Sequence, residues 1–156
     1  LEFDGSQFYP LEDNAIKNGH PSNRWTVVYA TTGAINTSDQ ELKQDIDSLS
    51  DAELRVATRI KGLIKKYRWK DAVVAKGDDA RIHVGAIAQE VEQAFTDESL
   101  DADRYAIFCK DEWYEVDGKI AESLLEPHTS ETENAVKVTR LGLRYDQLLA
   151  FVIATL

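Results

Sequence analysis

The first chemistry that this sequence offers is a serine followed five residues later by a lysine, Ser38 and Lys43. A lysine amine can take the proton of a serine hydroxyl only when burial favours the neutral amine, because an exposed ammonium stays protonated at neutral pH. Five positions correspond to about 140° around a helix and to opposite faces of a strand, so only a turn would bring the two side chains together. The alternative is an ordinary helix start with Ser38 as N-cap and Asp39 in the first turn, and the spacing alone favours it.

Other side chains with chemical potential have ordinary structural explanations when each is taken alone. His83 lies beside Gly85 in a predicted strand, which is typical of a half-buried structural histidine, and Gln89 at a helix start is typical of a solvated polar residue. The three tryptophans are candidates for a sugar-binding platform, although tryptophan is more often part of a core. They are Trp25, Trp69 and Trp113.

The cysteine and histidine content argues against disulfides and metals. Cys109 is the only cysteine and follows the apolar residues Ala106, Ile107 and Phe108, which favours a buried structural thiol over a nucleophile. One cysteine forms no internal disulfide and no cysteine-based zinc site, and the three histidines lack the spacing of metal ligands. We therefore expect no metal and no other cofactor.

The charge balance limits the classes of partner. The chain has 28 acidic and 18 basic residues, for a net charge of −10. Binding to nucleic acid requires a basic face that displaces counterions from phosphates, so we expect no nucleic acid and no anionic membrane surface as partner. No stretch reaches the roughly 18–20 apolar residues of a membrane span. We expect a soluble protein made in a reducing cytosol, and the lack of methionine suggests a piece of a longer polypeptide.

Residues 1–37 differ in composition from the rest of the chain. They contain two of the three prolines and three of the eight glycines, and they show no helical periodicity. Within 25–30, Trp25, Val27 and Tyr29 alternate with Thr26, Val28 and Ala30, which is the spacing of a strand. So short a segment cannot bury both faces of a strand by itself, so it needs partners from upstream chain or from other subunits.

Residues 38–156 predict a small α+β domain of short strands and about three helices. Ser50 and Glu53 have the spacing of a capping box, which predicts a helix that begins at Asp51. This helix is predicted over 51–66, and strands over 67–70 and 81–87 form a hairpin through a turn at 76–79. A second helix follows over 88–96, and then a strand within 104–114, with Phe108, Trp113 and Tyr114 as core candidates. A surface loop over 126–134, a strand over 136–145 and a last helix from Asp146 complete the prediction.

The last helix is apolar almost all round. Tyr145, Leu148, Leu149, Val152 and Leu156 recur at spacings of three and four residues, and other apolar side chains lie between them. Such a helix must be covered either by the core of its own domain or by copies of itself in an oligomer, and the pattern leaves both explanations open.

Four sequence blocks, in this order, resemble the Peptidase S74 family, the C-terminal intramolecular chaperone domains of phage endosialidase tail spikes, tail fibres and neck appendages. The third is similar to the family pattern H-x-G-x-x-A-Q-x-V and the fourth to G-[IL]-R-Y-x-x-L-L. The blocks are Asn36-Thr37-Ser38-Asp39 with Leu42-Lys43, Tyr67-Arg68-Trp69, His83-Val84-Gly85-Ala86-Ile87-Ala88-Gln89-Glu90-Val91 and Leu141-Gly142-Leu143-Arg144-Tyr145-Asp146-Gln147-Leu148-Leu149. The resemblance covers about 120 residues, from Ser38 to the end.

The resemblance implies a division of labour along the chain. Residues 1–37 would be the end of a β-rich tail spike or fibre stalk, and residues 38–156 a chaperone that forms a homotrimer with its last helix at the trimer axis. The chaperone would align the upstream stalk and then be released by cleavage of the Thr37–Ser38 bond. Ser38 would be the nucleophile and Lys43 its base, with His83 and Gln89 in supporting roles. Such a single-turnover peptidase would act in the host cytoplasm during assembly, and the stalk would remain on the virion tail.

Two other functions are compatible with the same domain. One is a trimeric tip that stays attached to the fibre and binds a receptor or sugar through an exposed tryptophan. The other is a plain trimerisation domain without chemistry, whose trimer would not depend on the residue at position 38 or 43.

Overall fold

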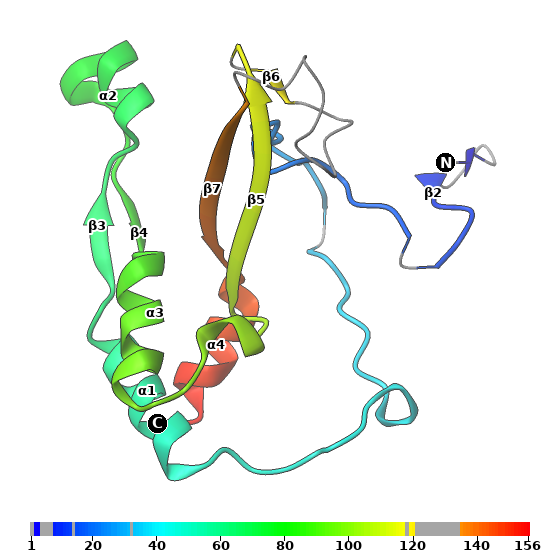
Figure 1. The fold of residues 1–156 in the computed structure, drawn as a ribbon, viewed down its shortest axis with the longest axis vertical. Coiled ribbons are helices and arrows are strands. Elements are labelled where there is room, and N and C mark those ends of the chain that lie inside the picture. Colours follow the sequence, from blue (N-terminus) through cyan, green and yellow to red (C-terminus); the bar gives the residue numbers. More distant parts are fainter. Residues whose placement is uncertain (1, 4–7, 14, 32, 118, 121–134) are drawn as a thin grey trace. The chain divides into compact units, whose positions relative to one another are not determined.

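The computed structural model describes the chain except residues 1, 4–7, 14, 32, 118 and 121–134 (Figure 1). The predicted loop over 126–134 lies outside the described residues. The chain divides into two compact units, Leu1–Ser38 and Asp39–Leu156.

In the described residues of the first unit, one small hairpin accompanies otherwise irregular chain. Strand β1 (Glu2–Phe3) pairs antiparallel with β2 (Phe8–Tyr9). Residues 25–30, which have the spacing of a strand that needs partners, have no regular structure in this single chain, and Tyr29 is 94% exposed. Trp25 instead packs beside Gly19 and its indole N–H donates to Asn18 Oδ1 over 3.1 Å. An alternating pattern becomes a strand only when a neighbouring strand accepts its backbone hydrogen bonds.

The first long helix, α1 (Asp51–Lys61), begins where the sequence predicts. Ser50 Oγ accepts from the Glu53 amide at 3.3 Å, and the Glu53 carboxylate accepts from the Ser50 amide at 2.7 Å, which completes the capping box. The helix ends at the C-cap Gly62, short of the predicted residue 66. The chain turns there because the next residues, from Lys65 onward, pair as a strand.

The segment that follows is an extended hairpin, Lys65–Gly85, which we call the arm. Strand β3 (Lys65–Tyr67) pairs antiparallel with β4 (His83–Gly85), so the predicted hairpin is confirmed. Between the strands lie helix α2 (Lys70–Lys76) and the 3-10 turn η2 (Gly77–Asp79). The prediction of a strand through Lys70 was therefore wrong: the strand ends at Tyr67, and a short helix begins instead.

The remaining elements follow the predicted order. Helix α3 (Ala88–Asp97) leads through the 3-10 turn η3 (Ala102–Arg104) to a three-stranded antiparallel sheet in the order β6-β5-β7. Its strands are β5 (Phe108–Val116), β6 (Lys119–Ile120) and β7 (Val136–Leu143). Helix α4 (Tyr145–Ile153) follows directly. The α+β class is confirmed, and the described residues contain four α-helices where the sequence predicted about three, because α2 was missed.

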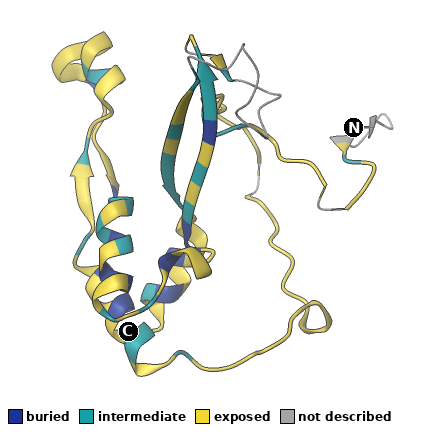
Figure 2. Ribbon diagram, viewed as in Figure 1, coloured by how far each residue is buried: buried dark blue, intermediate teal, exposed yellow. Residues whose placement is uncertain are grey.

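The hydrophobic core forms where α1, α3, α4 and the start of β5 meet (Figure 2). Phe95 is fully buried, with its ring 4.6 Å from Tyr105 and 6.0 Å from Phe151 between centroids. Phe108 and Trp113 are buried as predicted, whereas Cys109, predicted to be buried, is only partly covered. It follows Phe108 directly in β5 and therefore points to the opposite face of the strand from that ring. Leu148 and Phe151 of α4 are buried, while Leu149 and Ile153 are exposed. Within one chain, the last helix is therefore a core helix on one side and an uncovered apolar surface on the other.

Candidate functional site

The residues around the predicted scissile bond lie in exposed chain. Thr37 and Ser38 have no regular structure, and Asp39–Ser48, which we call the linker, is exposed at every residue. The linker contains one 3-10 turn, η1 (Gln40–Leu42), whose N-cap is Asp39: its side chain accepts from the Glu41 amide at 3.0 Å. The alternative of an ordinary helix with Ser38 as N-cap is therefore wrong.

The turn in the linker is of the kind that a Ser38–Lys43 pair requires. Lys43 is the C-cap of η1, and its amide donates to the Gln40 carbonyl over 3.0 Å. The backbone thus reverses between the two residues instead of continuing as a helix or strand. Both side chains are exposed in this single chain, so the burial that a lysine base needs is not supplied by the described residues.

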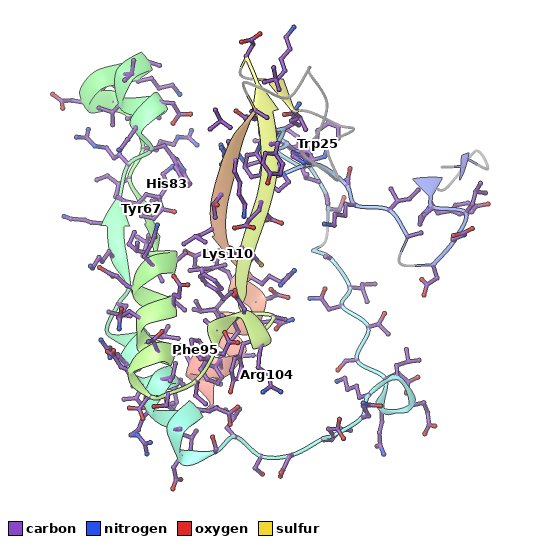
Figure 3. All side chains as sticks on the ribbon, in the orientation of Figure 1. Trp25, Tyr67, His83, Phe95, Arg104 and Lys110 are labelled. Carbon is purple, nitrogen blue, oxygen red and sulfur yellow. The ribbon has the colours of Figure 1, made fainter. Side chains whose placement is uncertain are left out.

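His83 is exposed on the arm, contrary to the half-buried position predicted from its surroundings. It lies opposite Tyr67 in the β3–β4 pairing, with the two rings stacked at 5.8 Å between centroids (Figure 3). Trp69 meets both rings edge-on, at 5.4 Å from Tyr67 and 6.2 Å from His83. Burial raises the pKa of the Tyr67 phenol, and the neighbouring Tyr145 raises it further. These three rings form a half-exposed aromatic cluster on a two-stranded hairpin.

Gln89 is the second residue of α3 and is exposed. It follows the arm closely in sequence, four residues after Gly85, the last residue of β4. The structure thus joins His83 to Tyr67 and Trp69, while Ser38 and Lys43 flank the η1 turn.

Tyr145, which the sequence places in the last helix and in the fourth block, has a structural contact that the sequence did not predict. Its hydroxyl accepts from the Ala86 amide at 3.0 Å and lies 3.4 Å from the Ala86 carbonyl. A Cβ atom on Gly85 would overlap this hydroxyl, so glycine is required there for close approach. The contact ties the start of α4 to the base of the arm, and it joins the third and fourth sequence blocks across 59 residues. A glycine inside a strand pattern was the available signal.

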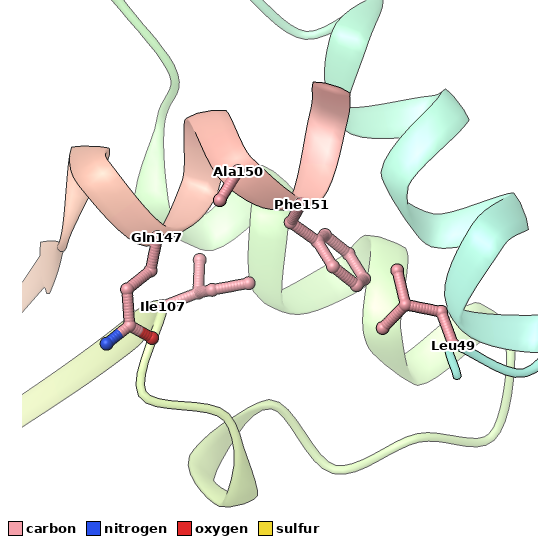
Figure 4. A pocket seen from close by; sticks show the side chains of 5 residues that line it. All are labelled: Leu49, Ile107, Gln147, Ala150 and Phe151. Carbon is pink, nitrogen blue, oxygen red and sulfur yellow. The ribbon is translucent and has the colours of Figure 1, made fainter. Parts of the chain in front are cut away.

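Two hollows lie on the second unit. One, of about 330 Å³, is lined by Leu49, Ile107, Gln147, Ala150 and Phe151, and only Gln147 among these is polar (Figure 4). The other, of about 490 Å³, is lined by Asp103, Phe108, Lys110 and Glu112. Among the residues that the structure describes, no cluster of three or more histidine, cysteine or acidic side chains is arranged to hold a metal ion. No helix in the same residues has the length and apolarity to cross a membrane.

Comparison with known proteins gives matches over nearly the whole chain. A family model described as chaperone of endosialidase, Peptidase S74, matches residues 38–100. The chain is 34% identical over 150 residues to the probable tail spike protein of Klebsiella phage 0507-KN2-1, which covers 88% of this chain and 12% of that protein. It is 31% identical over 153 residues to the tail spike protein of Escherichia virus K5, covering 96% of this chain and 22% of that protein. The chain therefore spans less than a quarter of the length of either relative.

Two solved structures resemble this fold. The carboxy-terminal domain of the bacteriophage T5 L-shaped tail fibre with its intramolecular chaperone domain aligns with a TM-score of 0.69 and 29% identity, over 94% of this chain and 35% of that one. A crystal structure of a novel intramolecular chaperone aligns with a TM-score of 0.58 and 30% identity, over 76% of this chain and 93% of that one.

Proposed function

We propose a function for this chain from its membership of the Peptidase S74 family, the chaperones of endosialidase. It forms a trimer and aligns the phage tail spike or fibre stalk that precedes it. It then cuts its own backbone between Thr37 and Ser38. Two observations support this: both solved structures that the chain resembles are described as intramolecular chaperones or as containing one, and its relatives include phage tail spike proteins. One observation carries the proposal of cleavage: the family match begins at Ser38, the residue that would become the new N-terminus.

The first unit exposes apolar side chains that contact with other chains could cover. Apolar side chains stand in water over much of its length, with Val28, Tyr29 and Ile35 among the most exposed. In an interwoven stalk these would pair between chains, and such non-local pairing has a high entropic cost before any contact is gained. A trimeric module at the C-terminal end makes the later pairing effectively intramolecular and so lowers that cost.

The proposed reaction is an acyl shift within one peptide unit followed by hydrolysis. The Ser38 Oγ attacks the Thr37 carbonyl carbon while Lys43 Nζ takes the hydroxyl proton. The C–N bond then breaks, the Ser38 amine leaves with that proton, and the Thr37 acyl group is held as an ester on Oγ. Water opens the ester to a Thr37 carboxylate and restores the serine. Fixed proximity of attacking and attacked groups contributes on the order of 7–11 kcal/mol in well-aligned intramolecular reactions.

Assembly supplies what the single chain lacks for this chemistry. Ser38 and Lys43 are exposed here, and a lysine acts as base when it is desolvated or placed near other cations. Trimerisation covers surfaces that are open in one chain, among them the exposed side of α4 with Leu149 and Ile153. Cleavage would thus follow assembly in the host cytoplasm, and the released stalk on the virion would be kinetically trapped because its folding module is gone.

A second candidate is a trimeric tip that stays attached and binds a sugar or receptor. The observation that favours it is the aromatic cluster on the arm, in which Trp69 is 48% exposed beside Tyr67 and His83. Half-exposed aromatic faces are the usual platform for sugar rings, and this candidate predicts that the chain remains intact.

The test is intact mass spectrometry of the chain expressed with several hundred upstream residues, beside its Ser38→Ala and Lys43→Ala variants. Ser48→Ala is the matched control, because it removes an exposed hydroxyl from the same linker. We expect a fragment that begins at Ser38 from the wild type and from Ser48→Ala, and intact chain from the other two. Intact chain in every sample favours the attached tip, and unchanged cleavage of Ser38→Ala excludes Ser38 as nucleophile.

A further inference from the structure

The hollow of about 330 Å³ forms a groove along one side of α4, which we call the α4 groove. Leu49 and Phe151 lie together at one end of it, and Gln147 lies at the other (Figure 4). Ile107 and Ala150 complete the lining, so that Gln147 alone among these five residues is polar. An apolar groove in contact with water favours an apolar occupant.

The linker enters the core at the Leu49 end of this groove. Leu49 follows the linker directly and is partly buried against the core cluster. Ile46, three residues earlier, is 68% exposed. Three residues of chain span at most about 10 Å, so the fixed position of Leu49 keeps Ile46 close to the α4 groove. Its side chain is therefore an apolar occupant within reach.

The linker also has the length to lie along the whole groove. Helix α4 rises about 1.5 Å per residue, which places Arg144 about 10 Å before Phe151 along the helix. Extended chain advances about 3.3 Å per residue, so Asp45 reaches up to about 13 Å back from Leu49. A linker laid along α4 can thus seat Ile46 between the two ends of the groove while Asp45 reaches the level of Arg144.

A cation stands beyond the Gln147 end of the groove. Arg144 is the N-cap of α4, and its spacing of three residues from Gln147 puts the two side chains on one face of the helix. Its amide donates to the Ile107 carbonyl over 2.9 Å, and its guanidinium donates to the Ala106 carbonyl. Arg144 is exposed and forms no ion pair with any residue that the structure describes.

The linker carries the opposite charge. Asp45 and Asp47 stand on either side of Ile46, and they accept hydrogen bonds from their neighbours Gln44 and Ser48. Neither carboxylate forms an ion pair within the described part of the chain. An apolar side chain flanked by carboxylates is complementary to an apolar groove that ends at an arginine.

We infer that the α4 groove is the docking site for the linker of the same chain, with the Ile46 side chain seated between Leu49 and Gln147 and the Asp45 carboxylate paired with Arg144. The inference rests on the proposed self-cleavage and deepens it. Docking moves only the chain between η1 and Leu49. The turn η1 stays outside the docked segment, so the reversal of the backbone that the Ser38–Lys43 pair requires is kept.

Docking would tie cleavage to assembly. Gln147, Ala150 and Ile153 follow one another at spacings of three, so the groove continues around the helix into the exposed apolar side of α4. A second copy that packs on Ile153 would therefore also cover the docked linker. Lys43, three residues before Ile46, would be held within about 10 Å of the groove, where this contact removes water. Removal of water disfavours an ammonium and so favours the neutral amine that a base must be.

A disulfide tests docking without reference to cleavage. In the Ser38→Ala chain with its upstream residues and with Cys109→Ser, Ile46→Cys is combined with Ala150→Cys. A disulfide requires Cα atoms within about 7 Å of each other, so we expect the 46–150 bond in most chains, as found in non-reduced peptides by mass spectrometry. Ile46→Cys with Val74→Cys, an equally exposed pair that includes the arm helix α2, is the control and is expected to give none.

Each other outcome of the disulfide experiment overturns part of the inference. Absence of the 46–150 bond, or an equal yield from the control pair, overturns docking. A bond that joins two chains, seen as covalent oligomers on a non-reducing gel, overturns the assignment to the same chain. The 46–150 bond in a protein whose wild type never cuts would leave docking intact and refute self-cleavage alone.

The rate of cleavage tests what docking does. Ile46→Asp puts a charge into the apolar groove and is expected to slow cleavage at least tenfold, whereas Ile46→Leu keeps an apolar side chain and is expected to cut at the wild-type rate. Val136→Asp, an exposed change of the same kind on β7, is the matched control and should also leave the rate unchanged. Because Ile46 is exposed in the undocked chain, its substitution leaves the core intact, which equal melting temperatures would verify. Normal cleavage of Ile46→Asp overturns the inference.

Discussion

The core of the second unit and its arm are built from similar residue types but reach opposite degrees of burial. The core residues Phe95, Ile60 and Leu148 are almost inaccessible to solvent, whereas the arm, with Trp69 and Val84, has large apolar side chains in water. The difference is one of layers. Helices α1, α3 and α4 cover one another, while the arm is a two-stranded ribbon with only a short helix at its end. The core is therefore complete in one chain, and the arm has the character of an element that functions by meeting a partner.

The sharpest test of this contrast compares two large aromatic side chains. Phe95→Ala is expected to cost about 3–5 kcal/mol of unfolding free energy, because it leaves a cavity in a fully packed site. Trp69→Ala removes a half-exposed ring that meets Tyr67 and His83 edge-on, and it is expected to cost about 1 kcal/mol. Urea unfolding followed by far-ultraviolet circular dichroism measures both. Equal losses would mean that the arm is as much part of the folded core as α3.

The junction between the two regions gives the next largest effect. Gly85→Ala places a methyl group against the Tyr145 hydroxyl and is expected to cost about 1–3 kcal/mol. Tyr145→Phe removes that hydroxyl, so the nearest ring atom to a Cβ at position 85 is then Cζ, at 3.1 Å. The double variant should therefore lose less stability than the sum of the two single variants.

Gly142→Ala is the control for this junction, since a Cβ there meets Cys109 Cβ at an ordinary 3.7 Å. Its unfolding free energy should change by less than about 1 kcal/mol. Strictly additive losses for Gly85→Ala and Tyr145→Phe would contradict the contact.

The start of α1, on the core side of the comparison, is expected to depend on its cap. Ser50→Ala removes the hydroxyl that accepts from the Glu53 amide, and it should cost about 1 kcal/mol. Ser48→Ala, two residues earlier, has a side chain with no such role and should be neutral. Thermal unfolding of the three proteins side by side distinguishes them, and equal melting temperatures for the wild type and Ser50→Ala would contradict the capping box.

The smallest expected effect is a pH dependence of the same cap. Hydrogen bonds from the Ser50 side chain, the Ser50 backbone and the Tyr105 hydroxyl lower the pKa of the Glu53 carboxyl below its ordinary 4.5. The folded state thus binds this proton less readily than the unfolded state, so the stabilisation is fully present above pH 4.5 and is lost as the pH falls through the lowered pKa. Unfolding free energies of wild type and Glu53→Gln should therefore converge in acid, and a constant difference down to low pH would contradict the assignment.

Local sequence signals predicted those helices whose ends are marked by residues in the helix itself. The Ser50–Glu53 box located the start of α1, and the apolar periodicity from Ala88 located α3. Signals failed where the outcome depended on a neighbour. Helix α2 has no side-chain cap at Trp69 and buries no residue, so nothing in its sequence announced a helix.

The candidate site divides in the same way. The motif residues were identified from sequence, and the turn that a Ser38–Lys43 pair requires is present as η1. The roles of Ser38, Lys43, His83 and Gln89 stay predictions, because catalysis depends on burial and mutual position, which one chain with an exposed linker does not supply.

By itself, the sequence determined the class of the domain, most of its elements, its acidic balance and its family, because composition, periodicity and short motifs are local properties of the chain. Only the tertiary structure decided that one side of α4 enters the core and that Tyr145 closes over Gly85. These outcomes depend on which surfaces meet across long separations in the chain. Tertiary contacts between distant segments decide which side chains are buried and which hydrogen bonds form, and the local preference of a residue does not.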